Sequence, residues 1–167
     1  MLLDPHIHNG AAPAIVKNML YDTLTRYNEN RSTASGLAVS WENPDPKTYT
    51  FKLREGVKFH DGSTMTADDV KFSIERILDK KTRATRAADL GMISKVEVVD
   101  PLNVKFMLSD PNASLLSVLA RETTAIMSKK WVEAGNDPQT KPNGTGAFKF
   151  VSWEKGVKIT VVRNANY

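Results

Sequence analysis

The sequence predicts an α+β fold, in which pairs of strands and helices occupy separate stretches of the chain. Apolar and polar residues alternate at residues 49–53, 104–108 and 157–161, which is typical of strands buried on one face. Apolar residues at helical spacing lie between these segments, most clearly at residues 70–78. No apolar run approaches the ~20 residues of a membrane span, so a folded domain of mixed structure is expected.

The composition is that of an ordinary globular protein and excludes several kinds of chemistry. Of 167 residues, 41% are hydrophobic and 25% are charged, which argues against a largely disordered chain. The net charge of +4 is modest and the basic residues are scattered, so no nucleic-acid partner is expected. Cysteine is absent, which excludes disulfides, thiolate metal sites and a cysteine nucleophile.

The first half of the chain reads as a helix followed by strands. Pro13 suits the first turn of a helix because its missing N–H would have no partner there, and apolar residues follow at helical spacing. After a loop at residues 32–36, the period changes to two. Short strands are expected at residues 38–41, 49–53 and 57–59.

The clearest helix begins at Thr66. The Thr66 hydroxyl and the Asp69 carboxylate are spaced to form a capping box, in which each side chain bonds the other residue's backbone N–H. The buried stripe of this helix is expected to consist of Val70, Ile74, Ile77 and Leu78.

The second half predicts two further hairpins with short helices between them. Strands are expected at 93–99 with 102–108 and on both sides of residues 154–156, helices at 114–120 and 129–134, and a short buried strand at 123–127. The chain ends directly after a predicted strand, and no strand leads into Asp4 and Pro5. We therefore expect both ends to be cut within a larger fold.

Five segments in a fixed order carry a resemblance to a known family: LDPH at residues 3–6, YTFKLREGVKFHDG at 49–62, TADDVKFSIER at 66–76, GTGAFKF at 144–150, and RNANY at 163–167. They resemble the N-terminal portion of the extracytoplasmic solute-binding proteins of peptide and nickel ABC importers, family 5. Ala147 departs from this pattern, since the family usually has proline there.

The resemblance implies a fragment of a two-lobed fold like that of the periplasmic binding proteins. Residues 1–30 and 125–167 would form a discontinuous part of lobe I, residues 31–124 would form its extra domain, and lobe II would be absent from this chain. By chemistry, the matched segments are scaffold features, so they identify the fold and do not locate a site.

The function that the resemblance implies is capture of peptides or a similar small polar solute outside the cytoplasm, with delivery to the permease subunits of an ABC transporter. No enzyme activity and no cofactor are expected. The location would be periplasmic, or the cell surface for a lipoprotein, with membrane association only through a permease or a lipid anchor outside this chain. Two alternatives remain open: a sensor module built on the same fold, and a metal-dependent hydrolase that uses His6, His8 and His60.

The resemblance implies six ligand-binding residues: Asn9, Gly10, Ala11, Arg121, Thr123 and Thr145. Glycine lets a backbone approach a ligand closely. An arginine can pair with a ligand carboxylate through two parallel hydrogen bonds, or it can simply complement the dipole of a helix that ends nearby. Both interpretations of Arg121 stay open.

Other conspicuous residues are interpreted as structural. The segment from Gly144 to Gly146 lacks the lysine of a phosphate loop and precedes a strand, so it is expected to turn the chain. His6 and His8 have the spacing of a metal pair on an extended chain. Without cysteine or an identifiable third ligand, we interpret them as surface residues and expect no metal site.

Overall fold

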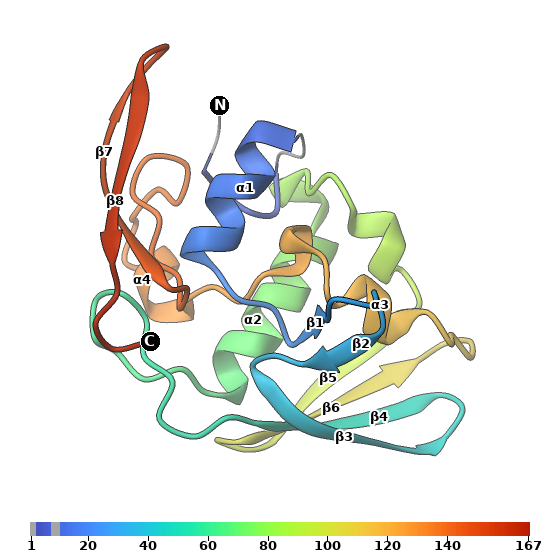
Figure 1. Ribbon diagram of the computed structural model, residues 1–167. Helices are drawn as coiled ribbons and strands as arrows, with labels where there is room; N and C mark the ends of the chain where they lie inside the picture. Colours follow the sequence, from blue (N-terminus) through green and yellow to red (C-terminus); the bar gives the residue numbers. More distant parts are fainter. Residues whose placement is uncertain (1–2, 8–10) are drawn as a thin grey trace.

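The computed structural model describes residues 3–7 and 11–167, and it has the α+β architecture that the sequence predicts (Figure 1). The helices are α1 (Ala11–Leu20), α2 (Ala67–Leu78), α3 (Leu115–Val118) and α4 (Lys129–Glu133), with short 3-10 turns η1 (Lys80–Thr82), η2 (Ala87–Leu90) and η3 (Glu122–Thr124). The strands are β1 (Thr25–Tyr27), β2 (Thr33–Ser35), β3 (Ala38–Asp45), β4 (Thr48–Leu53), β5 (Ile93–Asp100), β6 (Asn103–Leu108), β7 (Phe148–Glu154) and β8 (Lys158–Arg163).

The largest unit is a four-stranded antiparallel sheet of order β3-β4-β6-β5, with α2 lying across one face (Figure 1). Phe51 pairs with Val104 and Tyr49 with Phe106, so their side chains project to the same face. These four residues are buried, and the rings of Phe51 and Phe106 lie 5.1 Å apart. The alternation in the sequence therefore predicted which face of each strand is buried.

Helix α2 begins as its sequence predicts. The capping box is present, and Asp69 Oδ2 accepts a hydrogen bond from the backbone N–H of Thr66 at 2.9 Å. The predicted stripe residues Val70, Ile74 and Ile77 are buried against the sheet. Helix α2 therefore covers one face of the sheet, and the side chains between them form the larger hydrophobic core.

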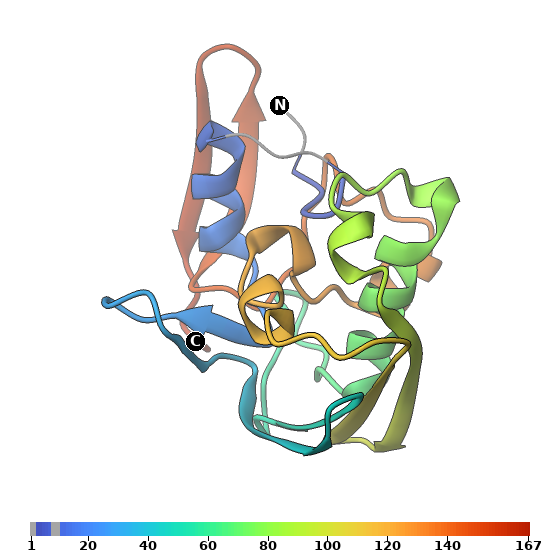
Figure 2. The ribbon, with the colours of Figure 1, turned by 90° about the vertical axis from the view of Figure 1, so that its right-hand side faces the viewer.

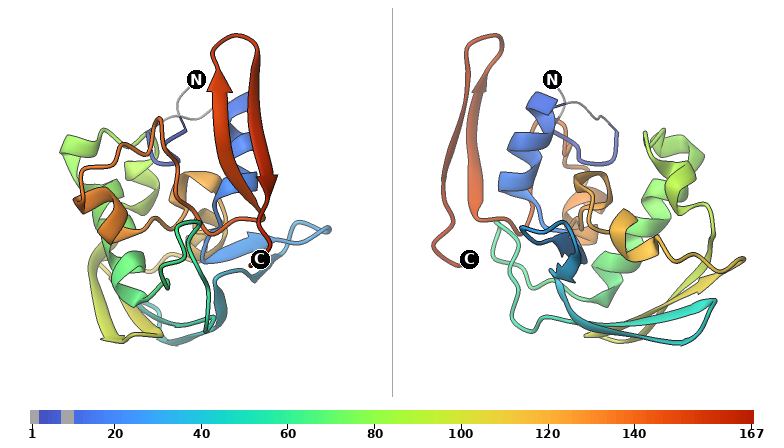
Figure 3. Two further views of the ribbon diagram at one scale, coloured as in Figure 1. Left: turned by 90° about the vertical axis from the view of Figure 1, so that its left-hand side faces the viewer. Right: turned by 45° about the vertical axis from the view of Figure 1, so that its right-hand side comes forward.

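A second, smaller core lies beside the β7–β8 hairpin, which stands next to α1 in two different views (Figures 2 and 3). Leu20 and Tyr21 from the end of α1 are buried there with Ala125 and Met127. Among the described residues, no helix has both the length and the apolar character that crossing a bilayer requires.

The segment from Gly144 to Gly146 packs against the end of α1 with no room for side chains. A Cβ on Gly144 would lie 2.0 Å from the carbonyl oxygen of Leu20, and one on Gly146 would lie 2.5 Å from that of Met19. The Gly146 carbonyl accepts hydrogen bonds from His60 Nε2 at 3.0 Å and from Asn164 Nδ2 at 3.1 Å. Both glycines are thus required by close backbone approach, and the expectation that they turn the chain is refined accordingly.

The structure differs from the sequence expectations at several short elements. Residues 57–59 form only one isolated bridge, between Lys58 and Thr64. The strand expected at 123–127 is absent, and η3 occupies its first part. The helix expected at 114–120 is the single turn α3, and the presumed loop at 32–36 contains strand β2, which pairs with β1. Elements this short have too few residues for a period to be recognised.

We predict that Gly144→Ala destabilises the protein by roughly 1–3 kcal/mol, because the added methyl group has to displace backbone. Gly91→Ala is the matched control: Gly91 has right-handed helical backbone angles, and the nearest atom to an added Cβ is 3.3 Å away. Its free energy of unfolding should change by less than about 1 kcal/mol. Urea unfolding measures both values, and equal effects would contradict the packing argument.

Candidate functional site

Three of the six predicted ligand-binding residues are well described by the structure. Asn9 and Gly10 lie outside the described residues, and Ala11 is described only as the first residue of α1. Arg121, Thr123 and Thr145 lie in segments that follow α3 or α4, and their surroundings differ.

Thr145 lies on a groove of about 660 Å³ between the end of α1, the β1–β2 hairpin, residues 54–58 and the C-terminal residues. Its Oγ1 donates a hydrogen bond to Asp22 Oδ2 at 2.8 Å. The Tyr167 hydroxyl donates to the other oxygen of Asp22 at 3.3 Å. The charge of Asp22 also raises the pKa of the Tyr167 phenol, with burial as a further cause. The Asp22 carboxylate is therefore occupied by two hydroxyl donors within the protein.

The remaining charges of this groove are mostly positive. Arg26, Arg54 and Lys58 line it, against Glu55 and Asp22. A groove with three cations and one carboxylate not engaged by those hydroxyls suits a small polar molecule with a negative group.

Arg121 does not line this groove, although its neighbour Ala120 does. Its Nη1 donates to Asp89 Oδ2 at 2.8 Å, and Arg86 Nη1 lies 3.7 Å from the same oxygen. The Arg121 side chain is 41% exposed. The arginine is thus held by a carboxylate of η2 at the surface, a partner that the sequence did not identify.

Thr123 is buried within η3, and its Oγ1 is one of the buried side-chain atoms without a hydrogen-bond partner in the described structure. An unpaired hydroxyl in the interior costs about 1–3 kcal/mol, so such positions are uncommon. The structure therefore separates the predicted residues into Thr145 on the groove, Arg121 with Asp89, and Thr123 in the interior.

The most conspicuous polar cluster is one that sequence reasoning missed. Arg76 of α2 donates to both carboxylate oxygens of Asp4, at 3.2 Å to Oδ1 and 2.5 Å to Oδ2. The Asp4 side chain is 1% exposed and that of Arg76 is 14% exposed. This two-bond ion pair ties the N-terminal segment to a residue of α2 that lies 72 residues further along the chain, which no local pattern reveals.

His6 belongs to the same cluster, and its interpretation as a surface residue is wrong: it is 1% exposed. Arg76 Nη1 lies 2.8 Å from His6 Nδ1, and His6 Nε2 lies 2.9 Å from the carbonyl oxygen of Ala125. Because a guanidinium can only donate, Nδ1 accepts and Nε2 carries the proton of a neutral ring. Burial lowers the pKa of His6 to about 4, and the positive charge of Arg76 contributes to this shift.

Lys17 of α1 is also buried, next to the same cluster. Burial lowers the pKa of its ammonium group, while the charges of Asp4 and Glu122 oppose that shift. The N-terminal segment, α1 and η3 therefore meet around a small set of charges in the interior.

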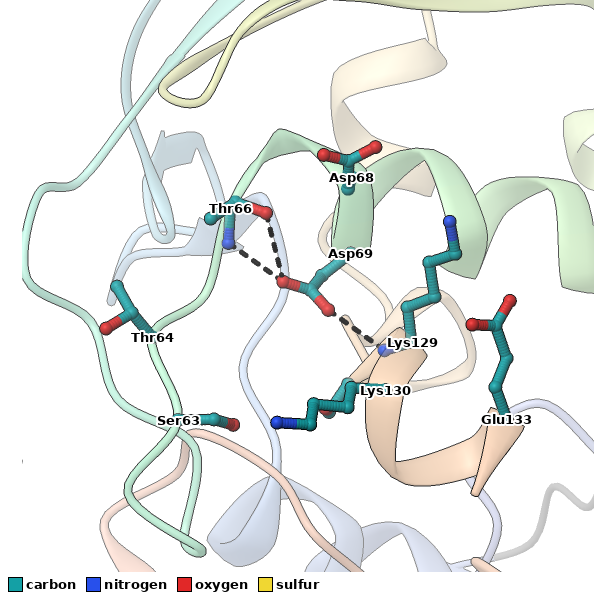
Figure 4. A pocket seen from close by; sticks show the side chains of 9 residues that line it. Ser63, Thr64, Thr66, Asp68, Asp69, Lys129, Lys130 and Glu133 are labelled. Carbon is teal, nitrogen blue, oxygen red and sulfur yellow. Dashed lines mark hydrogen bonds between the residues drawn. The ribbon is translucent and has the colours of Figure 1, made fainter. Parts of the chain in front are cut away.

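A second groove of about 500 Å³ lies between the start of α2 and α4 (Figure 4). Figure 4 shows the Asp69 carboxylate between Thr66 and Lys129, and its Oδ1 accepts from the backbone N–H of Lys129 at 2.9 Å. Burial raises the pKa of Asp69, against the effect of these hydrogen bonds. Both of its oxygens accept hydrogen bonds within the protein, so Asp69 joins the start of α2 to α4.

No metal centre is formed by the described part of the chain, since no three of its His, Asp or Glu side chains come close enough together to hold an ion. His6 and His60 bond to different carbonyls, those of Ala125 and Gly146. His8, the third histidine of the hydrolase alternative, lies outside the described residues.

Residues 33–167 match the family described as bacterial extracellular solute-binding proteins, family 5, middle region. The chain belongs to that family. The resemblance to this family is thereby confirmed, and four of the five segments that carry it lie within the matched residues. The family is one of solute-binding proteins.

Individual members of the family 5 solute-binding proteins are similar along the whole chain. The glutathione-binding protein GsiB of Pectobacterium atrosepticum is 32% identical over 99% of this chain and 32% of its own length. The binding protein AgaA of A. tumefaciens R10, solved with agropinic acid, is 38% identical with a TM-score of 0.93, over 99% of this chain and 34% of that one. The Escherichia coli murein tripeptide binding protein MppA is 28% identical with a TM-score of 0.91, over 99% and 36%.

These structures confirm the fold class as part of a periplasmic-binding-protein fold. The chain spans about a third of the length of the relatives that it matches.

We predict that Arg76→Met lowers the free energy of unfolding by roughly 3–5 kcal/mol, because it leaves the Asp4 charge buried without its partner. Lys95→Met is the control, since Lys95 pairs with Glu97 at the surface and the loss there should be at most about 1 kcal/mol. Chemical denaturation of both variants measures the difference. Similar losses in the two variants would contradict this prediction, because the buried ion pair would then contribute no more to the free energy of unfolding than the surface pair does.

Proposed function

We propose that this chain is part of the substrate-binding component of an ABC importer, which captures a small polar solute outside the cytoplasm and delivers it to a membrane permease. The observation that carries this proposal is the match to family 5 over residues 33–167. A relative of similar fold, from Helicobacter pylori, is described as an ABC transporter-associated periplasmic binding protein in complex with a peptide. That similarity supports a permease partner and a periplasmic location as part of the proposal, with the cell surface as the location for a lipoprotein.

The solute that we propose carries a carboxylate. Glutathione, agropinic acid and a murein tripeptide, which the names of the relatives specify, are all small polar molecules with acidic groups. Three cationic side chains line the groove beside Thr145, against the two carboxylates of Asp22 and Glu55, and Asp22 is already bonded to two hydroxyls. Electrostatics therefore favours an anionic group over a cationic one in this groove.

The contact residues stay those of the sequence prediction. Arg121 is proposed to release Asp89 and to bind a ligand carboxylate in its place. In the structure, Asp89 accepts a hydrogen bond from only one nitrogen of the Arg121 guanidinium. The unpaired Oγ1 of Thr123 supports a polar contact at η3, and the position of Thr145 supports one in the groove. Asn9, Gly10 and Ala11 are proposed on the resemblance alone.

The mechanism that we propose is closure of two lobes on the solute. A ligand that contacts both lobes stabilises the closed form relative to the open form, and the closed form is the one that a permease recognises. No bond of the solute is made or broken in this cycle, so no catalytic residues are required.

The test uses the complete reading frame that encodes this chain and isothermal calorimetry with glutathione, di- to pentapeptides and the C-terminal amides of the same peptides. We expect micromolar or tighter binding of carboxylates and a 10- to 100-fold loss in Arg121→Gln, since a hydrogen bond to a charged group contributes about 1.5–3 kcal/mol. Arg163→Gln, on strand β8, is the matched control and should bind normally.

Two outcomes would contradict this proposal. If Arg121→Gln keeps the wild-type affinity for the acids, and binds them more tightly than their amides to the same degree as the wild type does, Arg121 does not bind the ligand carboxylate. Sub-micromolar binding by the 167-residue chain alone would contradict closure of two lobes, because a ligand enclosed from one side buries too little surface for such affinity.

A further inference from the structure

Residues 3–7 join parts of the protein that are far apart in the sequence. Besides the Asp4 ion pair, the carbonyl of His6 accepts a hydrogen bond from the Thr85 backbone N–H at 3.0 Å, and the Thr85 hydroxyl donates to the carbonyl of Ile7. The imidazole of His6 lies between Arg76 of α2 and Ala125, which follows η3. This one ring therefore contacts both α2 and the segment that follows η3. We call the place where residues 3–7 meet these two elements the junction.

Only one protonation state of His6 satisfies both neighbours. The guanidinium of Arg76 requires a lone pair on Nδ1, and the carbonyl of Ala125 requires a proton on Nε2. A second proton would have to be placed on Nδ1, which lies 2.8 Å from a nitrogen that can only donate. The favourable contact would then become a contact between two donors of like charge, on a residue that is 1% exposed and therefore shielded from bulk solvent.

We propose that His6 is an acid-sensitive lock on this junction: a proton on Nδ1 breaks the contact with Arg76 and releases residues 3–7 from α2. The proposal does not depend on which solute the protein binds. It concerns a group that neither the resemblance nor the comparisons assign to any function.

The charges that face His6 come from every element around it. Arg76 of α2 and Lys17 of α1 disfavour the protonated ring, and Asp4 favours it. Next to these, Glu122 faces Lys17, and the phenol of Tyr21 stays neutral because burial raises its pKa. Burial is the largest influence on His6, so the positive charges reinforce it and Asp4 does not reverse it.

The sign of the pH dependence follows. The pKa of His6 is about 4 in the locked state and 6.5 when the ring is free. Above pH 6.5 both states are neutral and the lock has its full strength. As the pH falls from 6.5 to 4, only the released state takes up a proton, so the ratio of released to locked protein rises by roughly 300-fold in total.

The experiment is a pH titration of the 167-residue chain from pH 7 to 3.5 by NMR. It follows the imidazole nitrogens of His6, the backbone amide of Thr85 and, as a reporter of the sheet, the amide of Phe106. We expect His6 to stay in the neutral Nε2–H form until close to pH 4, and Thr85 to shift with the same midpoint while Phe106 does not.

Two matched variants distinguish the effect of His6 from that of the partly buried His60. His6→Asn and His60→Asn each remove one titrating ring and one bond to a backbone carbonyl. The asparagine oxygen at position 6 can still accept from Arg76, so the acid transition of Thr85 should vanish in His6→Asn and persist in His60→Asn.

The proposal is overturned if His6 titrates near its ordinary pKa of 6.5, if Thr85 stays unchanged while His6 becomes protonated, or if Thr85 and Phe106 change together as in global unfolding. The wild-type titration decides between these outcomes even if a variant fails to fold.

Discussion

A buried ion pair sets where the beginning of the chain lies. Two charges in the interior are tolerated only with good mutual geometry and further hydrogen bonds, and Asp4 and Arg76 have both. Because the Asp4 side chain is almost fully buried, the N-terminal segment cannot leave α2 without exposing or isolating a charge. The position of His6 follows from this pair.

The sequence predicted the parts of the fold that rest on local patterns. Alternation identified strands β4 and β6 and their buried faces, and the spacing of Thr66 and Asp69 identified the start of α2. The β1–β2 hairpin was missed because three-residue strands carry almost no period. The assignment of residues 31–124 to an extra domain, and of residues 1–30 and 125–167 to lobe I, stays a prediction.

The candidate site was predictable only in part, for a different reason. Residue type suggested that Arg121 could bind a carboxylate, but its actual partner Asp89 lies 32 residues away and comes from another element. His6 was misread for the same reason: exposure depends on Arg76 and Ala125, which are distant in the sequence. Family membership supplies the class of protein, and the structure adds a groove beside Thr145 that three cationic side chains line.

A double-mutant cycle on Asp4→Asn and Arg76→Met tests most directly whether the ion pair between these residues stabilises the fold. The free energies of unfolding of the wild type, both single variants and the double variant are measured at pH 7. We expect a coupling energy above about 2 kcal/mol, with the double variant more stable than the sum of the single losses implies. A coupling energy below about 0.5 kcal/mol would contradict the account, because the two side chains would then contribute independently.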